Sequence, residues 1–89
     1  MKIILKKPGL KLLKIFLESS DNKIKSIKIT GDFFIYPEES IDKLETELTS
    51  IEIDEWTIKK RINNFVKKNN IRFFGITTEA ITEAILKCK

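Results

Sequence analysis

The sequence predicts an α+β domain, in which an antiparallel sheet of two or three strands is followed by three α-helices packed on one face. Two observations support this prediction. Toward the N-terminus apolar residues alternate with polar ones, which is the period of a β-strand. Toward the C-terminus they recur every three or four residues, which is the period of a helix. The 89-residue chain has no linker rich in proline, glycine or serine, so we expect a single domain over residues 1–89.

The sheet begins with a predicted hairpin. A first strand is indicated by the alternation of Leu13, Ile15 and Leu17 with Lys14, Phe16 and Glu18. The cluster Ser19–Asn22 is typical of a turn. The strand that follows has five residues of one parity, expected on the core face: Ile27, Ile29, Gly31, Phe33 and Ile35.

Two further features refine the predicted sheet. Ile24 is out of step with the parity of its strand, which indicates a β-bulge or a late start of the strand. A short third strand is predicted over Ile3 to Leu5, before a turn at Pro8-Gly9.

The first helix is expected to begin at Pro37, since proline suits the first helical position. Glu38 and Glu39 would then lie near the positive end of the helix dipole. The pair Thr49-Ser50 is expected to end the helix, and its apolar face comprises Ile41, Leu44 and Leu48.

The second and third helices have recognisable ends. The second helix is predicted to begin at the N-cap Asp54 and to end at Asn69-Asn70. The third is predicted to begin at the N-cap Thr77. An extended segment that is broken at Gly75 lies between the two helices. Lys67 and Lys68 suit the negative end of the second helix dipole. The apolar faces are predicted from Ile58, Ile62, Phe65 and Val66 in the second helix and from Ile81, Ala84, Ile85 and Cys88 in the third.

The composition argues against an enzyme that acts alone. The chain has no histidine, which removes imidazole acid–base chemistry, histidine-activated nucleophiles and almost every zinc site. Its three glycines are far apart, so no phosphate-binding loop is present. Cys88, the single cysteine, is expected to be a tail residue without a catalytic role. No apolar run approaches a membrane span or a signal peptide, so we expect a cytoplasmic protein without a membrane partner.

Charge is distributed unevenly around a net value of +4. Residues 1–30 carry +6, residues 31–58 carry −8 and residues 59–89 carry +6. This order is consistent with segments that face one another in the fold, and equally with one acidic and one basic surface. Lys59-Lys60-Arg61 is interpreted as a solvated helix face, and Trp56 as a residue at the edge of the core.

One junction has more aromatic side chains than a turn requires. The segment KITGDFFIYPEES places Phe33, Phe34 and Tyr36 beside Gly31-Asp32. The glycine suits a positive φ or a close backbone approach, and the aspartate suits hydrogen bonds to local amides. Phe34 and Tyr36, however, share the parity of the lysines. Large apolar side chains on the solvent parity indicate a surface that a partner covers.

The motifs of this chain resemble those of the lipoate–protein ligase accessory domain over nearly its whole length. That domain is the C-terminal domain of fused lipoate ligases, or a separate small subunit in two-component versions. The pattern is carried by Lys7-Pro8-Gly9-Leu10-Lys11-Leu12, Ile29, Gly31-Asp32-Phe33-Phe34, Pro37-Glu38-Glu39, Leu44-Glu45 and Gly75-Ile76-Thr77 with Glu79, Ile81 and Ala84-Ile85. Its most specific block is GDFF-x-x-PEE, and Leu10 stands where the family pattern has a second glycine.

The resemblance implies an accessory, non-catalytic subunit that forms a heterodimer with a large catalytic subunit. That large subunit would hold ATP, Mg and lipoate, none of which this chain would bind alone. The small subunit would be required for ATP-dependent activation of lipoate to lipoyl-AMP, and would serve lipoyl-acceptor proteins indirectly. The candidates for docking and for closure of the active site are Gly31, Asp32, Phe34, Tyr36, Pro37 and Glu38.

Two other classes of function are weighed against this one. A small basic nucleic-acid-binding module of α+β fold is the alternative, although the acidic middle segment and the missing stacking motifs argue against a nucleic-acid partner. A scaffold domain related by fold alone is the third.

Overall fold

Two antiparallel sheets and three helices make up the computed structural model, which describes residues 1–88. Strands β1, β2 and β3 form one sheet in the order β1-β2-β3, whereas β4 and β5 form a separate two-stranded sheet. Along the chain the elements are β1 (Lys2–Leu5), β2 (Leu13–Ser20), β3 (Lys23–Gly31), β4 (Phe34–Tyr36), α1 (Ser40–Leu48), α2 (Glu55–Asn69), β5 (Arg72–Phe74) and α3 (Thr78–Lys87). The predicted α+β class, with a three-stranded sheet, is confirmed.

The register of the larger sheet follows from the strand alternation. Ile15 lies between Ile3 of β1 and Ile29 of β3, so three branched apolar side chains form one row on the same face. Near the hairpin Ser19 pairs with Ile24, whereas the preceding Glu18 pairs with Ser26. The residue between Ile24 and Ser26 is therefore an extra one, and this β-bulge is the irregularity that the parity of Ile24 predicted.

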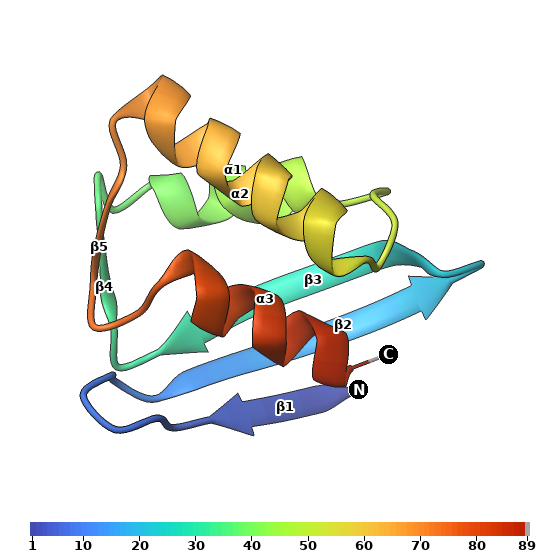
Figure 1. The fold of residues 1–89 in the computed structure, drawn as a ribbon, viewed down its shortest axis with the longest axis horizontal. Coiled ribbons are helices and arrows are strands. Elements are labelled where there is room, and N and C mark those ends of the chain that lie inside the picture. The colour runs from blue at the N-terminus through green and yellow to red at the C-terminus, as the bar shows by residue number, and fades with distance from the viewer. Residues whose placement is uncertain (89) are drawn as a thin grey trace.

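The helices cover one face of this sheet, as Figure 1 shows. Helix α3 packs on β1 and β2, α1 packs on β3, and α2 packs against both other helices. The apolar stripes predicted for the three helices are buried at Leu44, Leu48, Ile58, Ile62, Phe65, Ile81, Ala84, Ile85 and Cys88, and they meet the sheet residues Leu13, Ile15, Leu17, Ile24, Ile27 and Ile29. Within residues 1–88 no helix lies on the opposite face of the sheet (Figure 1).

The outer edge of β3 is sealed by other parts of the chain. Near the bulge Ile24 exchanges backbone hydrogen bonds with the segment that links α1 to α2, donating to Ile51 O at 3.0 Å and accepting from Ser50 N at 2.7 Å. Further along, the Ile29 amide donates to the Glu45 carboxylate of α1 at 2.6 Å. These contacts satisfy backbone groups that an edge strand would leave open.

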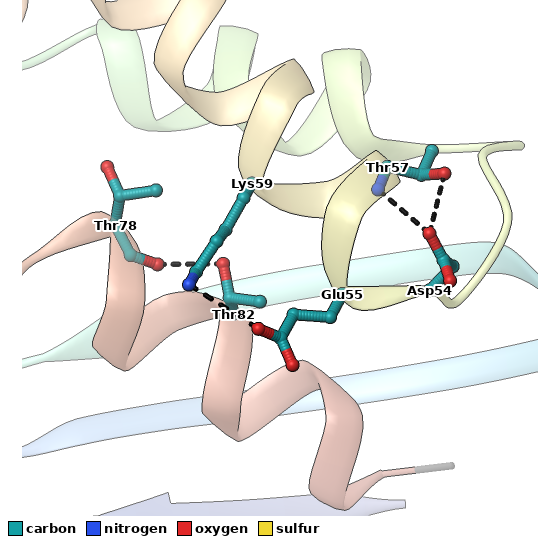
Figure 2. Close-up of polar contacts among 6 residues, drawn as sticks. All are labelled: Asp54, Glu55, Thr57, Lys59, Thr78 and Thr82. Carbon is teal, nitrogen blue, oxygen red and sulfur yellow. Dashed lines mark hydrogen bonds and ion pairs between the residues drawn. The ribbon is translucent and has the colours of Figure 1, made fainter.

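The predicted ends of α2 and α3 are confirmed. At the start of α2 the Asp54 carboxylate accepts hydrogen bonds from the amide and the hydroxyl of Thr57, both at 3.0 Å (Figure 2). At the start of α3 Thr77 Oγ1 accepts from the Ala80 amide at 3.0 Å. Helix α2 ends at Asn69, and its C-cap Asn70 has the left-handed conformation (φ 52°) common at helix C-termini.

The expected start of the first helix is wrong. Helix α1 begins at Ser40, three residues after Pro37, and the Tyr36–Pro37 peptide bond is cis. Pro37 belongs to a turn, in which its carbonyl accepts from the Ser40 amide at 3.0 Å. Because β4 ends at Tyr36, the chain needs this turn to bring α1 back over the larger sheet.

The interpretation of Trp56 is also wrong. The side chain is 68 % exposed, and the Lys60 ammonium lies 4.6 Å from the centre of its ring. The buried stripe of α2 passes through Ile58 and Ile62. Trp56 is two positions before Ile58, and residues two apart on a helix point in nearly opposite directions.

The Pro8-Gly9 turn forms as expected, although Leu10 replaces the family glycine. Gly9 has φ of +80° and the Leu10 amide donates to Lys7 O at 3.0 Å. Leu10 is partly buried against the core, so the larger side chain is accommodated.

Replacement of Gly31 by alanine is expected to destabilise the fold. A Cβ atom at this position would overlap the Leu12 carbonyl oxygen, which belongs to the backbone and has no freedom to rotate away. Overpacking of this kind typically costs about 1–3 kcal/mol. Thermal melting should therefore show Gly31→Ala well below the parent protein.

Gly9→Ala is the matched control. Gly9 also has a positive φ, but a Cβ there would meet no atom within 4 Å. It should lose only the backbone term of roughly 1 kcal/mol. Equal losses in the two variants would contradict the close-approach argument.

Candidate functional site

The candidate site begins where β3 ends. Gly31 has φ of +150° and lies against the backbone carbonyl of Leu12, to which the next amide, that of Asp32, donates at 3.0 Å. The close approach expected for the glycine is confirmed. The expected role of the Asp32 side chain is not, because its backbone amide makes the bond and no described residue hydrogen-bonds its carboxylate.

Beyond Asp32 the chain enters a second sheet. Strand β4 pairs with β5, which lies between α2 and α3 in the sequence, and the two strands run side by side at one end of the molecule (Figure 1). Phe34 is paired with Phe74, Ile35 with Phe73 and Tyr36 with Arg72. Directly paired residues project from the same face of an antiparallel sheet, so the members of each pair share a side.

The two faces of this small sheet differ in burial. Ile35 is buried and Phe73 is partly buried against the core, which fixes the sheet to the rest of the domain. On the outer face Phe34 is 47 % exposed, Tyr36 59 % and Phe74 49 %. We call these three residues, with Arg72, the aromatic patch.

The aromatic patch is preorganised and slightly hollow. The rings of Phe34 and Phe74 are 5.9 Å apart between centroids and tilted by 51°, a favourable geometry for aromatic pairs. The four residues and Asn70 line a shallow hollow. Exposed apolar side chains are ordinary when scattered, but a contiguous aromatic group with an arginine has the composition of the centre of a protein–protein interface.

The structure brings together only part of the predicted site. Phe34 and Tyr36 are exposed, as their parity predicted. The prediction that their strand continues from Ile27 through Ile35 is wrong, because β3 ends at Gly31 and both residues lie in the second sheet. Gly31 and Glu38 line a neighbouring hollow that Phe34 also borders. Asp32 lines a different hollow beside the Pro8-Gly9 turn, and Pro37 lies in the turn after β4.

Sequence reasoning missed Phe74 and Arg72. It predicted an extended segment there but no partner strand for it. The Phe73-Phe74-Gly75 sequence was the available signal of a partner strand. It has two adjacent phenylalanines near a glycine, as does Gly31-Asp32-Phe33-Phe34.

Residues 1–88 contain no group of three acidic or cysteine side chains able to hold a metal ion, and none of the helices there is long and apolar enough to cross a membrane. Burial raises the pKa of the Cys88 thiol, which disfavours the nucleophilic thiolate.

The polar side chains near the contact of α2 with α3 form ion pairs and hydrogen bonds, mostly within their own helix. Lys59 lies 3.5 Å from Glu55 one turn earlier in α2, and the buried Thr82 hydroxyl donates to Thr78 O at 2.8 Å in α3 (Figure 2). Glu83 of α3 forms an ion pair with Lys7 at 2.7 Å, and this hydrogen-bonded ammonium holds the pKa of the carboxyl below its usual range. These contacts are typical of structural roles.

Three comparisons bear on the identity of the chain. A family model described as "Bacterial lipoate protein ligase C-terminus" matches residues 12–85. Lipoate-protein ligase A subunit 2 from Thermoplasma acidophilum is 43% identical over 44 residues, a segment that spans 49% of this chain and 47% of that protein. The chain therefore aligns with about half the length of this curated relative.

The third comparison is structural. The chain is similar to one in a solved structure that is described as an archaeal lipoylation system, comprising a bi-partite lipoate protein ligase and its E2 lipoyl domain from Thermoplasma acidophilum. The two chains share a TM-score of 0.78 and 31% sequence identity, over 96% of this chain and 97% of that one. With the family match over residues 12–85, this similarity confirms the resemblance seen in the motifs. The chain belongs to the family of bacterial lipoate protein ligase C-terminal domains.

Proposed function

We propose that this chain is the accessory subunit of a two-component lipoate–protein ligase and docks through the aromatic patch on a large catalytic subunit. In the proposed heterodimer it is required for ATP-dependent activation of lipoate to lipoyl-AMP. The related Thermoplasma protein is named subunit 2, and the similar solved structure is described as a bi-partite ligase, which supports the extension of a two-subunit arrangement to this chain.

The aromatic patch is the observation that carries the proposal. Tyrosine and arginine are among the residue types enriched at binding hot spots, and the patch presents both beside two phenylalanines. The pairing of β4 with β5 and the buried Ile35 hold the patch in place before any partner arrives. A preorganised surface loses little conformational entropy on docking.

The role that fits this geometry is conformational. We assign ATP, Mg and lipoate to the large subunit, as the family resemblance implies. Docking beside a mobile active site can help to assemble it or close it, and closure of this kind governs the activity of many enzymes. Lipoyl-acceptor proteins are then served indirectly, and the need for ATP favours a cytoplasmic complex.

The first test is an assay of lipoate-dependent ATP–pyrophosphate exchange. This chain alone should show no exchange, and exchange should appear when it is mixed with the large subunit from the same source. Exchange by this chain alone would refute the proposal. Equal exchange by the large subunit with and without this chain would do so as well.

The second test separates docking from folding by replacement of Phe34. Phe34→Ala should lose about 1 kcal/mol of folding stability, since the ring pair with Phe74 contributes roughly that much. Its affinity for the large subunit, measured by calorimetric titration, should fall about 30-fold, which corresponds to the 2 kcal/mol typical of a hot spot.

Two phenylalanines provide the controls. Phe16→Ala removes a side chain that is 44 % exposed on the other sheet, so docking should stay within about twofold of the parent. Phe33 is only partly buried, which is less than its strand parity suggested. Phe33→Ala should therefore cost about 2 kcal/mol of folding stability, which is below the loss for a fully buried phenylalanine. If Phe34→Ala docks as tightly as Phe16→Ala, the aromatic patch is not the interface.

A further inference from the structure

The uncovered face of the β1-β2-β3 sheet has an ordered pattern of its own. The register places Lys2, Phe16 and Lys28 in one row across the three strands, and Ile4, Lys14 and Thr30 in the next. We call these six residues the open face. Phe16 is 44 % exposed and Ile4 53 %. Phe16 lies between Lys2 and Lys28 in its row, and Ile4 lies next to Lys14 in the other.

The lysines of the open face have no carboxylate partner within residues 1–88. The ion pairs of the described chain involve Lys7, Lys59 and Lys87 instead. The Lys2 ammonium lies 5.8 Å from the centre of the Phe16 ring, a cation–π arrangement. Glu18 is on the same strand parity, but it lies beyond Phe16 toward the hairpin and pairs with Ser26.

We propose that the open face docks an acidic protein surface, in which carboxylates meet Lys2, Lys14 and Lys28 and one apolar side chain packs on Phe16 and Ile4. Charge complementarity selects this occupant. Three unpaired ammonium groups on one face repel a basic partner surface and lower the free energy of binding to an acidic one. The surface belongs to a different sheet from the aromatic patch. The proposal therefore stands independently of docking on a large ligase subunit.

A protein fits the open face better than a nucleic acid does. Sheets that bind single-stranded nucleic acid stack successive bases on two or three aromatic rings. The open face has one ring, and the Lys2 ammonium already lies near it. Its other exposed apolar residue, Ile4, offers packing but no stacking.

The experiment titrates the protein with two glutamate-rich peptides of equal length, one with a central leucine and the other with serine in its place. Chemical-shift changes of the backbone amide resonances of the isotope-labelled protein locate the binding site. Their dependence on peptide concentration gives the affinity. Shifts should cluster on β1, β2 and β3, and the leucine peptide should bind more tightly. The double variant Lys14→Glu/Lys28→Glu should lose at least about tenfold in affinity.

The matched controls isolate charge and apolar contact. Lys67→Glu/Lys68→Glu reverses the same amount of charge at the last turn of α2 and should change the affinity by less than about twofold. Phe16→Ser should abolish the advantage of the leucine peptide over the serine peptide. Thermal melting of each variant verifies that it is folded.

Several outcomes would overturn the proposal. They are the absence of binding, shifts clustered away from the open face, and equal losses in the two charge-reversal variants. Tighter binding of a single-stranded oligothymidylate to the same residues would overturn it too, and would assign the face to nucleic acid. Phe34→Ala should bind the acidic peptide normally, so failure here and failure of the ligase docking are distinguishable.

Discussion

The contact between Gly31 and the Leu12 carbonyl is the constraint on which the arrangement of both surfaces depends. It ends β3 and, with the Asp32 amide bond to the same oxygen, directs the chain out of the larger sheet. Had β3 continued, its alternation would have carried Phe34 and Tyr36 onto the face that holds Lys28 and Thr30. The break transfers them to a second sheet, so that aromatic and basic side chains of one parity form two separate surfaces.

Local sequence patterns predicted the features that depend on neighbouring residues, which are the buried strand face, the β-bulge and the helix starts. The alternation around Ile27 and Ile29 indicated the buried face, the misfit of Ile24 indicated the bulge, and Asp54 and Thr77 marked the starts of two helices. The pairing of β4 with β5 could not be predicted in this way. Two helices separate these strands in the sequence, and periodicity indicates that a segment is extended without naming its partner. Half of the aromatic patch was therefore missed, although the outward direction of Phe34 and Tyr36 was foreseen.

The contacts between charged segments give the charge order a structural context. Of the ion pairs in residues 1–88, one joins the first basic segment to the last segment, Lys7 with Glu83, and the others lie within single helices. None joins the acidic middle segment to the first basic segment. These two segments meet instead through hydrogen bonds, such as those between Ile24 and Ser50-Ile51 and the one from the Ile29 amide to the Glu45 carboxylate. The acidic middle segment thus lies against the first basic segment, with Lys23 paired to Glu52 in an isolated bridge, but no ion pair of the described chain joins the two.

The two surfaces proposed for docking differ in physical character. The aromatic patch is rigid, since its rings pack on each other and its strand is fixed to the core through Ile35. Rigid aromatic groups lose little entropy on docking and favour slow dissociation, which suits a lasting subunit contact. The open face depends on long lysine side chains, which increase the rate of encounter but are screened by salt. Such a face suits a partner that arrives and leaves while the first contact persists.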